Sequence, residues 1–213
     1  MRSQPVIVAF LLALPFAVRA DQGALTLELG PALSFVGARP SQGSGSTVVA
    51  TLGGGLLGVR YALSNEFEVS ASALWEAPAD YFHSGVQLGT PSGAVRGTLS
   101  ERVQRVGALG GVQYVRGFEW RFHLGAEAGW SRETFRRRDL LDVSDPSNVH
   151  SFGLGLQDRT IDSLILAPVV GVEWQFADHW SVSLLSRVQF FLGGANRVGL
   201  LVPLSIGYSW YLF

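Results

Sequence analysis

Two stretches of this chain alternate between apolar and polar residues. In residues 66–76, EFEVSASALWE, the odd-numbered positions are apolar and the even-numbered positions are polar apart from Leu74. In residues 120–130, WRFHLGAEAGW, the even-numbered positions are apolar and the odd-numbered positions are polar or glycine. Alternation at every second residue is typical of a β-strand with two different faces, because a helix would mix the two sets. Both stretches are therefore predicted to be strands.

The apolar face of each stretch begins and ends with an aromatic residue. These residues are Phe67 and Trp75 in the first stretch, and Trp120 and Trp130 in the second. Barrels that cross an outer membrane carry girdles of aromatic residues at both membrane interfaces. The pattern therefore predicts strands that cross a membrane with their apolar face toward lipid.

The same alternation predicts eight strands along the chain. They span roughly residues 24–39, 47–62, 66–77, 98–115, 119–135, 159–176, 180–192 and 199–213. We predict an all-β fold, an eight-stranded antiparallel up-and-down transmembrane β-barrel, because each strand signal recurs at this spacing. An even number of strands places both chain ends on the same side, which is the periplasmic side in such barrels.

The connections between these strands alternate in length. The connections at 63–67, 115–119 and 176–180 are short, and those near 40–46, 78–97 and 136–158, on the other side, are long and polar. On that second side only the connection at 193–199 is short. Outer-membrane barrels have short periplasmic turns and longer outer loops. We therefore expect the loops at 78–97 and 136–158 to present the variable outer surface.

A soluble β-sandwich, or a lipocalin-like barrel with an apolar interior, would show the same alternation. In those folds the apolar set would lie inside. Glycines on the polar face and charged residues at strand centres favour the opposite arrangement, with the apolar set outside.

The first twenty residues have the order of a secretory signal peptide. Arg2 is followed by the apolar segment VIVAFLLALPFAV, and Val18 and Ala20 are the small residues expected before a cleavage site. We expect cleavage after Ala20, which leaves residues 21–213 as one barrel domain. An uncleaved anchor would need about 20 apolar residues, more than this segment offers.

Composition excludes several classes of protein. There is no cysteine, which rules out disulfides, thiolate metal sites and a lipid-modified N-terminus. The formal net charge is −1, which argues against a broad basic face for nucleic acid. No phosphate-binding glycine loop lies between a strand and a helix, and we expect neither a cofactor nor a metal.

The last predicted strand ends in LVPLSIGYSWYLF. Its even-numbered residues form an unbroken apolar and aromatic face. Here the chain resembles the small eight-stranded outer-membrane proteins of the OmpA/OmpX type, whose last strand carries a signal for assembly. The residues that fit this signal are Ser205, Gly207, Trp210, Leu212 and the terminal Phe213. Phe213 lies one residue beyond the fitted pattern, so a second register with Tyr211 and Phe213 outward stays open.

This resemblance implies the location and the partners of the protein. It implies insertion into the outer membrane of a Gram-negative bacterium by the barrel-assembly machinery, as a monomer. The expected partners are outer-membrane lipids and lipopolysaccharide, and no nucleic acid is expected.

Charged residues on the inward face are predicted to fill the lumen. They are Glu28, Arg60, Glu68, Arg105, Arg121, His123, Glu127, Glu173 and Arg187, together with Gln189. An eight-stranded barrel is just wide enough for its side chains to fill it, and an unpaired buried ion is costly. We therefore predict a network of ion pairs that plugs the barrel. A gated pore for small ions is the alternative.

Histidine and serine pairs raise the possibility of a lipid-modifying enzyme. The candidates are His83 and Ser84, His150 and Ser151, and His179 and Ser181, the last resembling the His-x-Ser pattern of lipid A deacylases. The third pair lies at a predicted periplasmic turn, the wrong side for lipopolysaccharide, and no carboxylate is visibly placed to complete a triad. We therefore expect no enzyme. His123 and Glu127 lie about 13 Å apart along a strand, too far to share a metal ion.

The run RETFRRRDLLD is the strongest candidate for a ligand contact. Arg132 and the three arginines Arg136, Arg137 and Arg138 lie where a strand is predicted to leave the membrane outward. Arginine binds phosphate with two parallel hydrogen bonds, so these residues are candidates for contact with lipopolysaccharide. A solvated loop with Asp139 and Asp142 as partners explains the run equally well.

These observations favour a structural or surface-interaction role, in envelope integrity or adhesion. The first alternative is a narrow pore, and the second is an enzyme that modifies lipopolysaccharide. The fold alone cannot distinguish these roles, because one architecture hosts all three.

Overall fold

The computed structural model describes residues 22–38, 48–90, 93–142, 150–153, 158–193 and 197–211. The strands in this part of the chain are β1 (Ala24–Ala38), β2 (Val48–Ala62), β3 (Phe67–Thr90), β4 (Gly93–Gly117), β5 (Trp120–Asp142), β6 (His150–Gly153), β7 (Arg159–Gln175), β8 (Trp180–Leu192) and β9 (Arg197–Tyr211). No helix in these ranges is long and apolar enough to cross a membrane. The predicted signal peptide, residues 1–20, lies outside the described residues and stays a prediction.

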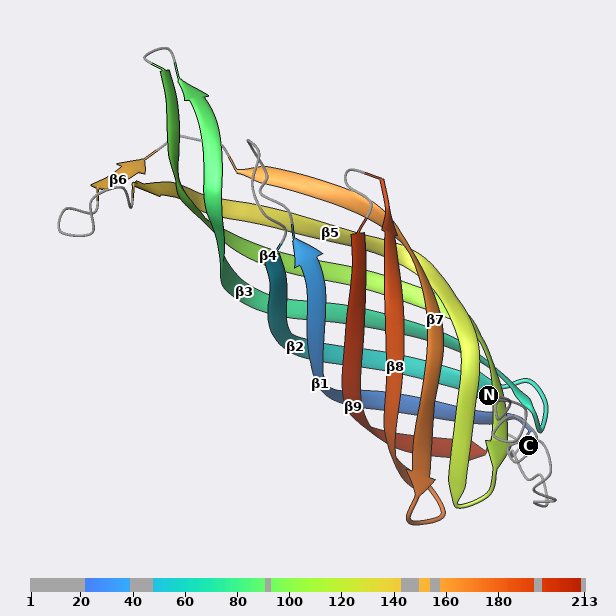
Figure 1. Ribbon diagram of the computed structural model, residues 1–213. Coiled ribbons are helices and arrows are strands. Elements are labelled where there is room, and N and C mark those ends of the chain that lie inside the picture. Colours follow the sequence, from blue (N-terminus) through green and yellow to red (C-terminus); the bar gives the residue numbers. More distant parts are fainter. Residues whose placement is uncertain are drawn as a thin grey trace, which may run out of the picture.

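Eight of these strands close into a ring, in the order β4-β3-β2-β1-β9-β8-β7-β5, with β5 pairing again with β4 (Figure 1). All pairings are antiparallel. The first and last strands are neighbours, and Ala24 lies opposite Tyr211. Closure gives strand backbones partners on both sides, as a sheet inside hydrocarbon requires. The prediction of an eight-stranded antiparallel barrel is confirmed.

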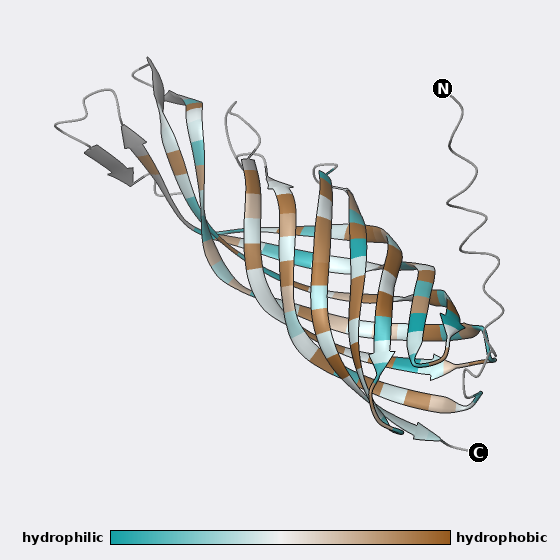
Figure 2. Cartoon of the chain, turned by 60° about the horizontal axis from the view of Figure 1, so that its bottom comes forward, coloured by the Kyte–Doolittle hydropathy of each residue, from teal (hydrophilic) through white to brown (hydrophobic). Residues whose placement is uncertain are grey.

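The polar residues of the strands lie inside the ring and the apolar residues lie outside. Figure 2 shows hydrophobic and hydrophilic residues alternating along the strands. Leu29 and Leu124 point outward with 65% and 63% of their surface exposed, whereas Arg105 and Glu127 are buried. A soluble barrel with an apolar interior would reverse this arrangement.

Aromatic residues concentrate at the end of the barrel that carries the short turns, here called the turn end. Trp120 stacks on Trp174 with ring centroids 5.8 Å apart, and Trp180 meets Tyr208 at 4.9 Å. The outward face from Trp120 to Trp130 spans about 25 Å along the barrel axis, allowing for strand rise and tilt. This height matches the apolar band of an outer-membrane barrel.

The predicted loop at 78–97 is wrong, because β3 continues to Thr90 and β4 begins at Gly93. The register of the β3–β4 pair shifts between Glu76 and Ala79 and again between His83 and Val86. Each shift changes whether the odd-numbered or the even-numbered residues of β3 face inward. The alternation that predicted the other strands is therefore interrupted twice, and the continuous hairpin resembles a loop in sequence.

The predicted loop at 136–158 is also partly wrong, because β5 continues to Asp142 and pairs there with β6. β2 and β3 separate beyond the pair Gly54–Glu76, and β7 begins at Arg159, which is paired with Phe135 of β5. The outer parts of β3, β4 and β5, with β6, therefore project beyond the ring, as Figure 1 shows. We call this part, residues 77–90, 93–103, 136–142 and 150–153, the projecting sheet.

Candidate functional site in the barrel lumen

A cluster of charged residues fills the lumen near the turn end. Arg60 of β2 lies at its centre, with Nη2 2.8 Å from Glu28 Oε1 and Nη1 2.9 Å from Glu68 Oε2. Nη2 also contacts Glu173 of β7. Arg121 of β5 bridges the other oxygens of Glu68 and Glu173. Inward positions of five strands thus supply one connected group of charges.

A second pair extends this cluster toward the middle of the barrel. Arg187 of β8 holds Glu127 of β5 through two bonds, Nε to Oε2 at 2.7 Å and Nη2 to Oε1 at 3.1 Å. Ser70 donates a further hydrogen bond to Glu127 Oε1 at 3.0 Å. The carboxylate of Glu127 is therefore fully occupied by donors.

Gln113 and His123 join this pair to the first cluster. Gln113 Nε2 donates to Glu127 Oε1 at 3.2 Å, and Gln113 Oε1 lies 3.1 Å from His123 Nδ1. His123 Nε2 lies 3.4 Å from Glu173 Oε2. We call the whole group the turn-end network: Glu28, Arg60, Glu68, Ser70, Gln113, Arg121, His123, Glu127, Glu173 and Arg187. Sequence reasoning missed Gln113, because a neutral amide carried no charge signal, although its odd number places it on the inward face of β4.

Arg105 is not part of this network. It contacts Glu76 and Ser34 on the other side of the lumen's middle. Nearby, Arg197 Nη2 lies 2.8 Å from Glu133 Oε2. The ring of Phe191 joins the two pairs, with the Arg105 and Arg197 guanidinium carbons 5.1 and 5.0 Å from its centroid.

We call this second group the projecting-end network: Ser34, Glu76, Arg105, Glu133, Phe191 and Arg197. Sequence reasoning missed most of it. Glu76 and Glu133 lie at the predicted ends of their strands, and Arg197 fell in a predicted connection. Gln189, predicted to face the lumen, is fully buried.

An apolar layer lies between the two networks along part of the ring, while β5 and β8 carry the buried polar residues Ser131 and Gln189 between their network members. The layer contains Ala32, Leu56, Leu74 and Leu201, next to a second cluster of Val36, Leu109, Ile165, Ala167 and Phe191. On β3, for example, Leu74 lies between Glu68 and Glu76 along the inward face. Leu74 was the exception to the alternation, and its inward position in this layer explains it.

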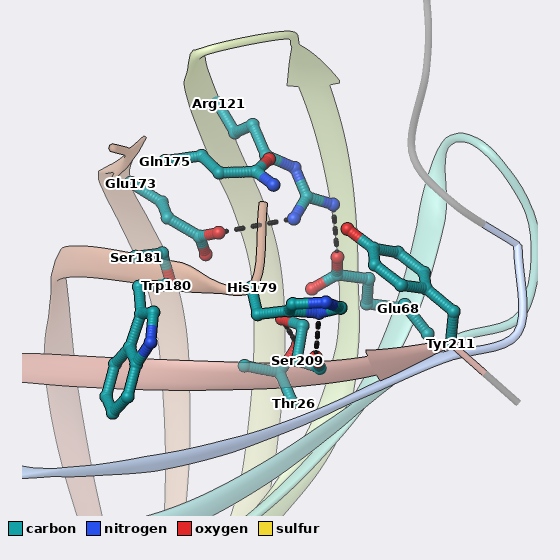
Figure 3. Close-up of a pocket in the computed structure, with 11 residues that line it drawn as sticks. Thr26, Glu68, Arg121, Glu173, Gln175, His179, Trp180, Ser181, Ser209 and Tyr211 are labelled. Atoms are coloured by element: carbon teal, nitrogen blue, oxygen red, sulfur yellow. Dashed lines mark hydrogen bonds and ion pairs between the residues drawn. The ribbon is translucent and has the colours of Figure 1, made fainter. Parts of the chain in front are cut away.

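The turn end of the lumen opens into a small polar vestibule (Figure 3). Arg121 lies between Glu68 and Glu173 on one side of it, and His179 and Tyr211 lie nearby. Its internal volume is about 10 Å³, close to the space that one water molecule needs. The vestibule is therefore too small for an organic ligand.

The two candidate catalytic pairs whose side chains the structure describes do not form the arrangement of a triad. His83 was predicted in an outer loop, but it lies in β3, fully buried, with Nε2 3.6 Å from Glu101 Oε2. Ser84 is exposed on the opposite face of the same strand. His179 donates Nδ1–H to the backbone oxygen of Ser209 at 2.8 Å.

No described contact joins His179 to the neighbouring Ser181, whose hydroxyl is buried and without a hydrogen-bond partner in the described part of the chain. The third pair lies in β6, where the side chains of His150 and Ser151 fall outside the described residues.

The exposed arginines lie where β5 leaves the apolar band. Arg132 binds Asp162 with Nε 2.9 Å from Oδ1, and its guanidinium carbon lies 5.2 Å from the centroid of the Trp130 ring. This hydrogen bond from Arg132 holds the pKa of the Asp162 carboxyl below its ordinary value. The structure pairs Arg132 with Asp162 of the neighbouring strand, a partner that sequence spacing could not suggest.

Besides Arg132, Arg136 is the one arginine of the run whose side chain the structure describes. Its Nε lies 3.9 Å from Asp158, and Arg102 of β4 lies directly opposite on the same outward face. Like charges placed opposite each other on a sheet are unfavourable. The side chains of Arg137, Arg138, Asp139 and Asp142 lie outside the described residues.

The last strand places its even-numbered residues outward. Leu204, Ile206 and Trp210 are exposed, while Ser205 and Gly207 face inward. This is the register with the fuller apolar face, and β9 keeps it to Tyr211. Leu212 and Phe213, the end of the proposed assembly signal, lie outside the described residues.

No protein-family model matches the chain. No curated protein matches its sequence either. Several solved structures match its fold, among them the attachment invasion locus protein Ail of Yersinia pestis, solved with the heparin analogue sucrose octasulfate. That match has 14% identity and a TM-score of 0.53, and covers 89% of this chain and 99% of Ail.

Two further structures match to the same degree. Neisserial surface protein A has 12% identity and a TM-score of 0.53, with 88% of this chain and 99% of that chain covered. The outer-membrane protein OprG of Pseudomonas aeruginosa has 12% identity and a TM-score of 0.53, with 89% and 97% covered. At this identity the comparison shows the fold alone, which is that of the small outer-membrane β-barrels.

Proposed function

We propose that this chain is an integral outer-membrane barrel with a closed lumen, and that it presents the projecting sheet as an interaction surface outside the cell. The observation that carries the proposal is the separation of β3 from β2 beyond the pair Gly54–Glu76. From there to Thr90, β3 pairs with β4 alone in the part of the chain that the structure describes. A strand edge with unpaired backbone groups can accept a strand from another protein.

The orientation follows from the connections. The turn end faces the periplasm, because short turns lie on that side in barrels of this kind. Both chain ends then lie in the periplasm, and the projecting sheet extends outward. The signal peptide directs export, and the barrel-assembly machinery inserts the mature chain as a monomer by recognising the last strand.

The outward arginines give this surface a second class of partner. Arg102 and Arg136 face each other above the apolar band, and an anionic group between them would offset their repulsion. Lipopolysaccharide supplies phosphates at the outer leaflet, and arginine binds phosphate well. Arg136, with Arg137 and Arg138 beside it in the chain, is therefore proposed to contact lipopolysaccharide.

A closed lumen favours the surface role over the pore. Two ion-pair networks and the apolar layer occupy the barrel, and an ion passing the apolar residues would lose part of its hydration. We expect the wild-type barrel to give no stepwise conductance in a planar bilayer. Replacing Leu74 and Leu201 together by serine should make the barrel leak, because both side chains lie in the layer.

The surface role is tested by trimming the hairpin. Asp80 and Arg102 are paired across β3 and β4, so residues 81–101 can be replaced by an Asn-Gly turn that keeps this register. The trimmed barrel should still shift in heat-modifiability gels, and cells that display it should lose adhesion to an epithelial cell layer. Adhesion equal to that of the full-length barrel would overturn the proposal.

A matched control uses the turn end. Glu66 is exposed in the turn between β2 and β3, on the opposite end of the barrel, so Glu66→Ser should leave adhesion unchanged. Conductance by the wild-type barrel would support the pore instead.

A further inference from the structure

The acidic residues around Arg60 outnumber the arginines that balance them. Glu28, Glu68 and Glu173 all contact Arg60, and Arg121 is the second guanidinium in contact with this group. All these side chains are buried or nearly so. A buried charge without a partner is costly. The group therefore needs one more positive charge, or one of its carboxyls must be neutral.

His123 is the side chain placed to supply that charge. Its Nε2 faces Glu173 Oε2 at 3.4 Å, and its Nδ1 faces Gln113 Oε1 at 3.1 Å. The orientation of the Gln113 amide is set by Glu127, because Gln113 Nε2 must donate to that carboxylate. Both ring nitrogens of His123 thus face oxygen atoms. The Nδ1 contact with Gln113 is a hydrogen bond, whereas Nε2 lies at ion-pair distance from Glu173 without hydrogen-bond geometry.

A neutral imidazole cannot satisfy both contacts. It has one N–H, so one ring nitrogen would point a lone pair at an oxygen lone pair. A proton on Glu173 is the other solution, but both Glu173 oxygens already receive arginine N–H groups, from Arg60 and Arg121. Donors on both oxygens favour the ionised carboxylate.

We infer that His123 is a charged imidazolium in the folded barrel, and that its extra proton joins the Arg60 cluster to the Glu127–Arg187 pair. The charged groups of the network to which His123 belongs are Glu28 of β1, Arg60 of β2, Glu68 of β3, Arg121 and Glu127 of β5, Glu173 of β7 and Arg187 of β8. Loss of the proton leaves the surplus negative charge of the Arg60 cluster unbalanced.

The protonation of the ring can be measured directly. The full mature chain, labelled with ¹⁵N-histidine, is refolded in detergent micelles, and the His123 signals are assigned by their loss in His123→Gln. At neutral pH both ring nitrogens of His123 should show attached protons. A ring with one proton would overturn the inference.

A pair of matched variants tests the cause. Glu173→Gln removes the charge that faces Nε2, so His123 should lose the proton on that nitrogen and keep the one that bonds Gln113. Glu133→Gln removes a buried carboxylate from the projecting-end network and should leave the His123 signals unshifted. A His123 ring that keeps both protons in the refolded Glu173→Gln barrel would show that Glu173 is not what holds the second proton.

Discussion

The two charged networks of the lumen differ in how their members are connected. In the turn-end network, Arg60 contacts three carboxylates and Gln113 and His123 connect this cluster to Arg187. In the projecting-end network, within the part of the chain that the structure describes, each arginine has one carboxylate partner and only the Phe191 ring joins the two pairs. Among the described contacts, Arg105 Nε and Nη1 have no hydrogen-bond partner.

This difference indicates how each half of the barrel responds to a lost charge. Removing a member of a connected network leaves several buried ions uncompensated. Removing a member of an isolated pair leaves one. The comparison therefore predicts larger effects on stability at the turn end than at the projecting end.

The largest effect is expected at Arg60. Arg60→Met leaves three buried carboxylates with only Arg121 and His123, and should cost about 5 kcal/mol, the upper end for breaking a buried pair. Urea unfolding of the barrel in lipid vesicles measures this. Arg60→Lys keeps the charge and should cost clearly less; equal losses would show that shape, not charge, matters here.

A smaller effect is expected at Arg105, which has one carboxylate partner. Arg105→Met should cost about 3 kcal/mol in the same assay, because only Glu76 is left unpaired. The double variant Arg105→Met with Glu76→Gln should recover much of that loss, since no uncompensated charge remains. If Arg105→Met costs as much as Arg60→Met, connectivity does not explain the difference between the networks.

The apolar layer should respond through packing alone. Leu74→Ala leaves a cavity and should cost about 2 kcal/mol, the low end for such truncations, because an inward residue of a narrow lumen can be partly replaced by water. The loss should not depend on salt or pH. A strong pH dependence would mean that the substitution disturbs the flanking networks.

The smallest effect is expected at the exposed pair of Arg132 and Asp162. Its hydrogen bond lowers the pKa of Asp162, so the pair contributes above the ordinary pKa of aspartate, about 3.9, and is lost as the pH falls through the lowered value. Both side chains are half exposed, and solvent screens such pairs. We therefore expect no measurable change in unfolding for Arg132→Gln.

The titration of Asp162 itself should still respond. In Arg132→Gln the pKa of Asp162, followed by the ¹³C shift of its carboxyl, should rise to the ordinary range of aspartate. If the pKa of Asp162 stays below its ordinary value in this variant, another group causes the shift.

Much of the barrel could be predicted from the alternation of apolar and polar residues. For example, residues 67–76 were predicted to form a strand, and they form the part of β3 that pairs regularly with β4. The prediction of strand residues failed beyond Glu76. There, two bulges change whether the odd-numbered or the even-numbered residues face inward. A bulge is set by how a strand bends against its neighbour, so the local sequence carries little signal for it. His83 was assigned to a loop for this reason.

The lumen shows the same division between sequence and structure. The alternation alone predicted that Glu28, Arg60 and Glu173 lie on the inward face. It could not pair them, because the partners lie on strands far apart in the chain, such as Glu28 on β1 and Ser183 on β8. Gln113 was missed because a neutral amide carries no charge signal, and Arg197 was missed because it fell in a predicted connection.

The sequence by itself determined that the strands have one apolar and one polar face, that aromatic residues mark their ends, and that the charges face inward. These are properties of residue order, and the period of two expresses them directly. Only the tertiary structure decided which charges meet, where the apolar layer lies and where the hairpin leaves the ring. Those features depend on register and closure, which bring together side chains that no local pattern connects.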